Sequence, residues 1–116
     1  MTRPLALIID DEPDIRELLD ITLQRMQVDT RGAGSVAEAM AQLQARTFDL
    51  CLADMRLPDG DGIAIVRHMN ERHPQTPVAM ITAHGDMDTA IEALKAGAFD
   101  FVSKPVDLPV LRRLVG

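Results

Sequence analysis

The sequence predicts an α/β protein built around a largely parallel sheet. Two observations lead to this prediction: short apolar runs alternate strictly with segments of helical period, and five such strand–helix units follow one another over 116 residues. Strict alternation favours a parallel sheet with right-handed crossovers between its strands. The length is that of one domain, and 47% hydrophobic with 26% charged residues is typical of a globular chain.

The first two units differ in the clarity of their strands. Leu5–Ile9 is apolar throughout, which is typical of a parallel strand covered on both faces. The helix after it has an apolar stripe at helical spacing, made of Ile15, Leu18, Leu19, Thr22, Leu23 and Met26. Val28–Arg31 is a weaker strand, which two glycines end. Ser35 and Glu38 match a capping box at the start of the second helix. Its inward face is predicted to be Val36, Ala39, Met40 and Leu43.

The third and fourth units are interrupted by a clear turn. Phe48–Ala53 is the third predicted strand, and Leu57–Gly62 is a turn because Pro fixes φ and the glycines permit positive φ. The helix that follows is predicted to bury Ile63, Val66 and Met69. Val78–Ile81 is the fourth strand. Met87–Ala96 is a helix of small residues, which Gly97 ends in the way that glycine usually ends helices.

The fifth unit is short. Its strand is predicted at Phe99–Val102, and a last helix is predicted to start near Asp107. That helix has fewer than three turns of chain before residue 116. We therefore expect residues 1–116 to form one domain that is a piece of a longer protein.

The composition excludes several classes of function. The chain carries 12 Lys and Arg against 18 Asp and Glu, a net charge of −6, and contains no Trp or Tyr. Both features argue against direct binding of nucleic acid, which needs clustered cations and stacking aromatics. Apolar runs are far shorter than a membrane span, and a signal peptide is not apparent, so we expect a cytoplasmic protein without membrane contact. The lone Cys51 fits a reducing compartment.

Charged and polar side chains follow the predicted strands at the point where each strand ends. Asp10 and Asp11 follow the first strand, and Asp54 follows the third. Thr82 follows the fourth strand, and Lys104 lies just past the fifth. Ligands bind such sheets outside the carboxyl ends of the strands. We therefore expect these five side chains to converge at one edge of the sheet.

This combination of groups predicts phosphoryl chemistry with a metal ion. Carboxylates a few ångströms apart repel one another and favour a bound cation, and Mg²⁺ prefers oxygen ligands of this kind. A carboxylate can attack phosphorus, and an ammonium group can neutralise the transferring phosphoryl group. Ordinary structural interpretations stay open: Asp10 and Asp11 could cap the first helix, and Asp54 could be a turn residue. Thr82 and Lys104 could be a strand-end hydroxyl and a solvated lysine.

Four motifs resemble the receiver domain of bacterial two-component response regulators, over essentially the whole chain. They are Asp10–Pro13, Asp54–Gly60, Ile81–Ala83 and Lys104–Pro105, in this order. Met80–Gly85 and Gly97–Phe101 further resemble the receivers of sigma-54-dependent activators, the nitrogen-regulator class. The resemblance implies a flavodoxin-like fold, with a doubly wound, five-stranded parallel sheet of order 2-1-3-4-5 and helices on both faces.

The resemblance also implies a role for each matching residue. Asp54 would accept the phosphoryl group. Asp11 and Asp54 would bind Mg²⁺ directly, together with the backbone carbonyl of Arg56, and Asp10 would act mostly through water. Thr82 would hydrogen-bond one phosphoryl oxygen after activation, and Lys104 would pair with another.

Further positions around the phosphoryl group follow from the same match. Phe101 takes the place of the switch aromatic, which is Tyr in many relatives. Phe has no hydroxyl, so any switch would act by packing. Phe101 could equally be an ordinary packed aromatic. The Lys104–Pro105 bond would be cis. Arg56, Ala83 and His84 would flank the phosphoryl pocket, and Arg56 and His84 would influence the lifetime of the phosphoryl group.

The function implied is a phosphorylation-dependent switch rather than an enzyme with a separate substrate. A sensor histidine kinase would be the phosphoryl donor. Attached or downstream ATPase and DNA-binding output domains would be the targets in transcription regulation, and a homodimer is plausible. One alternative is an aspartyl-phosphate phosphohydrolase, although that chemistry needs an acid where Arg56 stands, two positions beyond Asp54. A pseudo-receiver that is never phosphorylated and, more weakly, an FMN-binding flavodoxin are the others.

Overall fold

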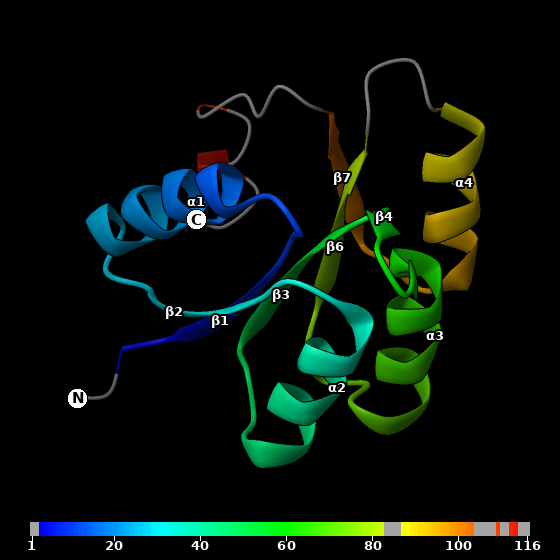
Figure 1. Ribbon diagram of the computed structural model, residues 1–116, viewed down its shortest axis with the longest axis horizontal. Coiled ribbons are helices and arrows are strands. Elements are labelled where there is room, and N and C mark those ends of the chain that lie inside the picture. The colour runs from blue at the N-terminus through cyan, green and yellow to red at the C-terminus, as the bar shows by residue number, and fades with distance from the viewer. Residues whose placement is uncertain (1–2, 83–86, 104–108, 110–111, 114–116) are drawn as a thin grey trace.

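The predicted parallel sheet is confirmed, with its strands in the order β2-β1-β3-β6-β7 (Figure 1). The computed structural model of the protein describes residues 3–82, 87–103, 109 and 112–113. All neighbouring strands of this sheet run parallel. The five strands are β1 (Leu5–Ile9), β2 (Asp29–Ala33), β3 (Leu50–Asp54), β6 (Val78–Thr82) and β7 (Asp100–Ser103). In chain order of the main strands this is 2-1-3-4-5, the order that the resemblance implied.

Helices cover both faces of the sheet. They are α1 (Pro13–Arg25), α2 (Val36–Ala45), α3 (Gly62–Arg72) and α4 (Met87–Ala96). Figure 1 shows α1 on one side and the other three helices on the opposite side. Alternate strand residues feed two separate cores: Ile8 and Leu52 pack with Leu19 of α1, whereas Leu7 and Cys51 pack toward the other helices. Such alternation follows from the opposite directions of successive side chains in a strand.

Local signals in the sequence explain the helix ends. One half of the predicted capping box is confirmed, because the Ser35 Oγ accepts the Glu38 N–H at 3.1 Å, whereas the Glu38 carboxylate accepts from the Ser35 hydroxyl at 3.3 Å. The end of α4 is also confirmed, since Gly97 has a φ of 127°, in the region that favours glycine. The last helix near Asp107 lies mostly outside the described residues; Pro109, Arg112 and Arg113 are helical.

Three predictions need correction. Leu18, placed in the inward stripe of α1, is 38% exposed, whereas Leu19, Thr22 and Leu23 are buried. The second strand continues through Gly32 to Ala33, because β2 is an edge strand that needs few buried side chains. The segment read as one turn contains a small antiparallel hairpin, β4 (Arg56–Leu57) and β5 (Gly60–Asp61). Among the described residues, every helix falls short of what crossing a membrane requires.

Candidate functional site

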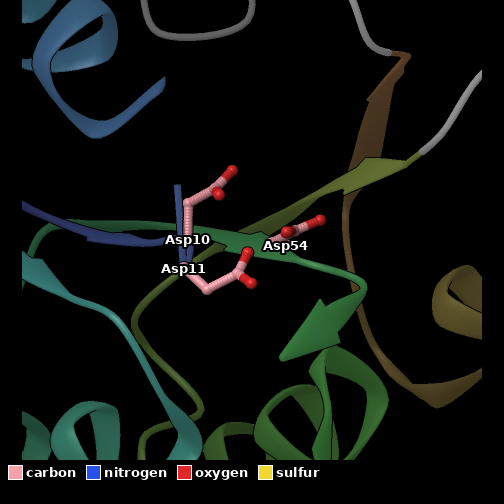
Figure 2. Close-up of side chains that lie close together, drawn as sticks. All are labelled: Asp10, Asp11 and Asp54. Atoms are coloured by element: carbon pink, nitrogen blue, oxygen red, sulfur yellow. The ribbon is translucent and has the colours of Figure 1, made fainter. Parts of the chain in front are cut away.

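Three of the predicted acidic residues meet at the carboxyl end of the sheet. Asp10 and Asp11 follow β1, and Asp54 ends β3 (Figure 2). Ile9 pairs with Ala53, so Asp10 and Asp54 stand one residue past the same register position on adjacent strands. One carboxylate oxygen from each of the three residues lies within 4.8 Å of the other two. The fold thus places these three groups together as the sequence predicted.

Two of the three carboxylates in this cluster are buried, which makes the repulsion between them costly. Asp10 is fully buried and Asp54 is 6% exposed, whereas Asp11 is exposed to solvent. Buried carboxylates that lie close together repel one another, and a cation between them relieves the repulsion. Asp10 is held firmly in this position: its Oδ1 accepts the Glu12 N–H at 2.9 Å, and its carbonyl accepts from the Arg16 guanidinium at 2.5 Å.

The donor set of the cluster fits Mg²⁺. All three side chains offer carboxylate oxygens, the hard ligands that Mg²⁺ prefers. Two ligands on opposite sides of a Mg²⁺ ion stand about 4.2 Å apart, twice the usual Mg–O distance. The three carboxylate oxygens lie within 4.8 Å of one another, near enough for one ion to contact more than one of them. Asp11 opens the cluster to solvent, so water can complete a coordination sphere.

Thr82 lies on β6, the strand next to β3, and Phe101 lies on β7, one strand further out. Asp54 pairs with Ile81, and the Met55 N–H donates to the Ile81 carbonyl at 3.1 Å, so Thr82 follows directly beside the end of β3. Thr82 is 1% exposed. Phe101, on β7, pairs with Met80 of β6 and is half-buried against the core on the α2–α4 side of the sheet. The predicted edge therefore includes Thr82.

Three other predicted positions lie outside the described residues. These are Ala83, His84 and Lys104, together with the Lys104–Pro105 bond that the resemblance makes cis. Arg56 is described: it is exposed in β4 and pairs with Asp61 across the hairpin. Its backbone thus belongs to a small ordered element that begins two residues after Asp54.

The sequence interpretation missed the contacts that hold this hairpin. Asp59, at its tip, accepts the N–H groups of Val36 and Ala37 at 2.7 and 3.0 Å, in the first turn of α2. These two hydrogen bonds hold the pKa of the exposed Asp59 carboxyl below its usual value. The Asp61 carboxylate accepts the Ala64 N–H at 2.9 Å and so caps α3. A cap by Asp61 is readable from its position before a helix. The Asp59 contact spans 23 residues and leaves no local signal.

Cys51 offers no nucleophile to this site. It lies in the middle of β3 and is fully buried among apolar side chains. Burial raises the pKa of its thiol far above the ordinary value. A thiol with a raised pKa stays protonated and unreactive at neutral pH. The chemistry of the site therefore rests on its carboxylates.

Comparisons with known proteins agree with this geometry. Residues 6–116 match the family described as the response regulator receiver domain. The response regulator protein PilR of Pseudomonas aeruginosa is 67% identical over 115 residues, which are 99% of this chain and 26% of PilR. The DNA-binding transcriptional regulator NtrC of Klebsiella pneumoniae is 38% identical over 93% of this chain and 23% of its own length.

A solved structure shares the architecture. The receiver domain of NtrX from Brucella abortus superimposes with a TM-score of 0.90 at 35% sequence identity. The match covers 95% of this chain and 93% of that one. By contrast, this chain spans about a quarter of the length of the curated relatives PilR and NtrC.

Proposed function

Because this chain belongs to the response regulator receiver domain family, we propose that it is a phosphorylation-dependent signalling switch with Asp54 as its phosphoacceptor. The observation that carries this proposal is the cluster of Asp10, Asp11 and Asp54, gathered at the shared end of β1 and β3. A sensor histidine kinase is the proposed phosphoryl donor. The domain catalyses only its own phosphorylation and dephosphorylation, so it is not an enzyme with a separate substrate.

Each residue of the cluster has a distinct proposed task. Asp11 and Asp54 would hold Mg²⁺ directly, with the backbone carbonyl of Arg56, and the buried Asp10 would act through water. The ion held there would neutralise charge on the transferring phosphoryl group. The hydrogen bonds from Glu12 and Arg16 to Asp10 keep this end of β1 in place during the reaction.

The transfer step uses one oxygen of the Asp54 carboxylate as the nucleophile. This oxygen forms a bond to phosphorus while the bond between phosphorus and the donor breaks, and the product is an acyl phosphate on Asp54. The electron pair of the broken bond leaves with the donor. The Thr82 hydroxyl donates a hydrogen bond to one phosphoryl oxygen. The Lys104 ammonium pairs with another and neutralises part of its charge.

The switch follows from the charge that the reaction adds. A phosphoryl group brings about −1.5 to −2 charge and three strong acceptor oxygens. Thr82 gains a partner only in that state, so its strand end is drawn toward Asp54. The half-buried Phe101 on β7 then repacks against the space that Thr82 leaves. Arg56, Ala83 and His84 flank the phosphoryl group and set its lifetime.

The partners of the domain are proposed from its relatives. NtrC is named a DNA-binding transcriptional regulator, and this chain matches less than a quarter of it. We propose that residues 1–116 are the receiver of a longer cytoplasmic regulator. Its ATPase and DNA-binding output domains would control transcription, and a homodimer would form. The receiver itself contacts neither nucleic acid nor membrane, in keeping with its net charge of −6.

Mass spectrometry tests the proposal directly. Incubation of the chain with acetyl phosphate and Mg²⁺ should add the mass of one phosphoryl group, and peptide mapping should place it on Asp54. Asp54→Asn should remain unmodified, because an amide is not a nucleophile of this kind. Asp29→Asn is the matched control, since Asp29 lies at the start of β2, at the opposite end of the sheet. An unmodified wild-type mass would favour a pseudo-receiver and reject the switch.

A further inference from the structure

The loop that follows Asp54 is closed tightly at its base. The Gly62 N–H donates to the Met55 carbonyl at 2.8 Å, which joins the two ends of the segment. Gly62 also packs directly on Asp54, since a Cβ at this position would lie 2.3 Å from the Asp54 carbonyl oxygen. Both ends of the hairpin segment therefore lie beside Asp54. A movement of the hairpin would shift the backbone next to Asp54.

The tip of the same hairpin is tied to another helix. Asp59 uses both of its carboxylate oxygens, one on the Val36 N–H and one on the Ala37 N–H. Gly60 lies against the Val36 side chain, because an added Cβ would be 3.1 Å from its Cγ2. The tip is thus fixed by two hydrogen bonds and by close packing.

The contact made by Asp59 is not redundant with the local cap of α2. The first N–H groups of a helix have no partners within the helix. Ser35 satisfies that of Glu38, whereas Asp59 satisfies those of Val36 and Ala37. A negative charge at a helix N-terminus is also favourable. The start of α2 is therefore a strong anchor, and Asp59 is the group that attaches the hairpin to it.

We propose that Asp59 is a positioning residue for the phosphoryl and metal site, acting through the hairpin of residues 56–61. It holds in place the hairpin that carries Arg56, whose backbone carbonyl is a proposed Mg²⁺ ligand beside the Asp10–Asp11–Asp54 cluster. This inference rests on the proposed function of that cluster. Asp59 itself is exposed at the tip and is no ligand. Without it the hairpin stays joined at Gly62, but its tip keeps only the packing of Gly60 on Val36 and loses both hydrogen bonds to α2.

The test compares two variants that remove different hydrogen bonds from the same helix end. Asp59→Ala removes the two hydrogen bonds between the hairpin and α2. Ser35→Ala removes the local cap of α2 and leaves those two bonds intact. Mg²⁺ affinity is measured on the free 116-residue chain by calorimetry and by amide shifts in NMR spectra. The rate of Asp54 phosphorylation by acetyl phosphate is measured in parallel.

Asp59→Ala should weaken Mg²⁺ binding by about tenfold, the lower end of the effect of groups that orient metal ligands. Ser35→Ala should leave the Mg²⁺ affinity within about twofold of the wild type, although both variants weaken α2. Asp59→Asn should recover part of the loss, because its side-chain carbonyl still accepts one N–H. This variant also serves if Asp59→Ala does not fold.

Each outcome decides the matter. Equal Mg²⁺ affinities in Asp59→Ala and the wild type overturn the inference alone, provided that the wild type binds Mg²⁺ and becomes phosphorylated. Equal losses in Asp59→Ala and Ser35→Ala overturn it too, because they show an effect through the stability of α2. A wild-type chain that binds no Mg²⁺ overturns both the inference and the metal site of the proposed function.

Discussion

Among the glycines that the structure describes, Gly62 should be the least tolerant of an added side chain. In Gly62→Ala, the added Cβ would lie 2.3 Å from the Asp54 carbonyl oxygen and 2.5 Å from the Met80 Cε. Non-bonded carbon atoms prefer separations of about 3.5–4.0 Å, so the backbone must shift by roughly 1 Å. Overpacking of this kind costs up to about 3 kcal/mol. Because Gly62 begins α3, the better helix propensity of Ala offsets about 1 kcal/mol of this.

The expected net loss is therefore about 2 kcal/mol in the free energy of unfolding, or about 8 °C in Tm for a domain of this size. Far-UV circular dichroism during urea and thermal unfolding is the suitable assay, since the chain has no Trp or Tyr. Gly32→Ala is the matched control, because its Cβ would meet the Arg16 side chain at an ordinary 3.4 Å. A Gly62→Ala protein as stable as the wild type would refute the reasoning. So would an equal loss in the control.

Three further predictions concern charge, packing and metal. Because folding lowers the pKa of Asp59 below its ordinary value of 3.8, its ionised carboxylate stabilises the fold above pH 3.8. This stabilisation is lost as the pH falls through the lowered pKa. Asp59→Asn should therefore reduce the slope at acid pH in a plot of unfolding free energy against pH. Leu19→Ala, in the core, should cost about 2–5 kcal/mol in urea unfolding, whereas the partly exposed Leu18→Ala should cost clearly less. Saturating Mg²⁺ should raise the Tm of the wild type, and that of Asp11→Asn much less, in calorimetric scans. A Tm rise of equal size in Asp11→Asn would remove this carboxylate from the metal site.

The central strands could be predicted from the sequence because they are buried on both faces. All five residues of β3 and of β6 are buried, so their apolar runs stand out from the helical periods around them. The edge strand β2 has an exposed Arg31 and Gly32, and its end was correspondingly misplaced. Leu18 was wrongly predicted to face inward, because helical spacing identifies an apolar stripe but does not show how much of that stripe the sheet covers.

The candidate site was predictable where it depends on the sheet and unpredictable where it depends on loops. Parallel strands end at a common edge, so the meeting of Asp10 and Asp54 follows from strand order alone. The hairpin is different, because two residues per strand carry too little periodicity to identify it. The bond from Asp59 to α2 joins segments 23 residues apart, and local patterns do not report such pairs.

Because Cys51 is fully buried, its reaction with a thiol reagent reports rare openings of the folded core. This thiol lies in the middle of β3 with no accessible surface, packed in the core on the α2–α4 side of the sheet. A thiol reagent reaches it only when the packing of helices on this face of the sheet opens, so the rate of labelling in native buffer measures how often that happens. A second cysteine introduced on the surface would react at once. The labelling rate of Cys51 could then be compared, in one molecule, with the fast labelling rate of the surface cysteine.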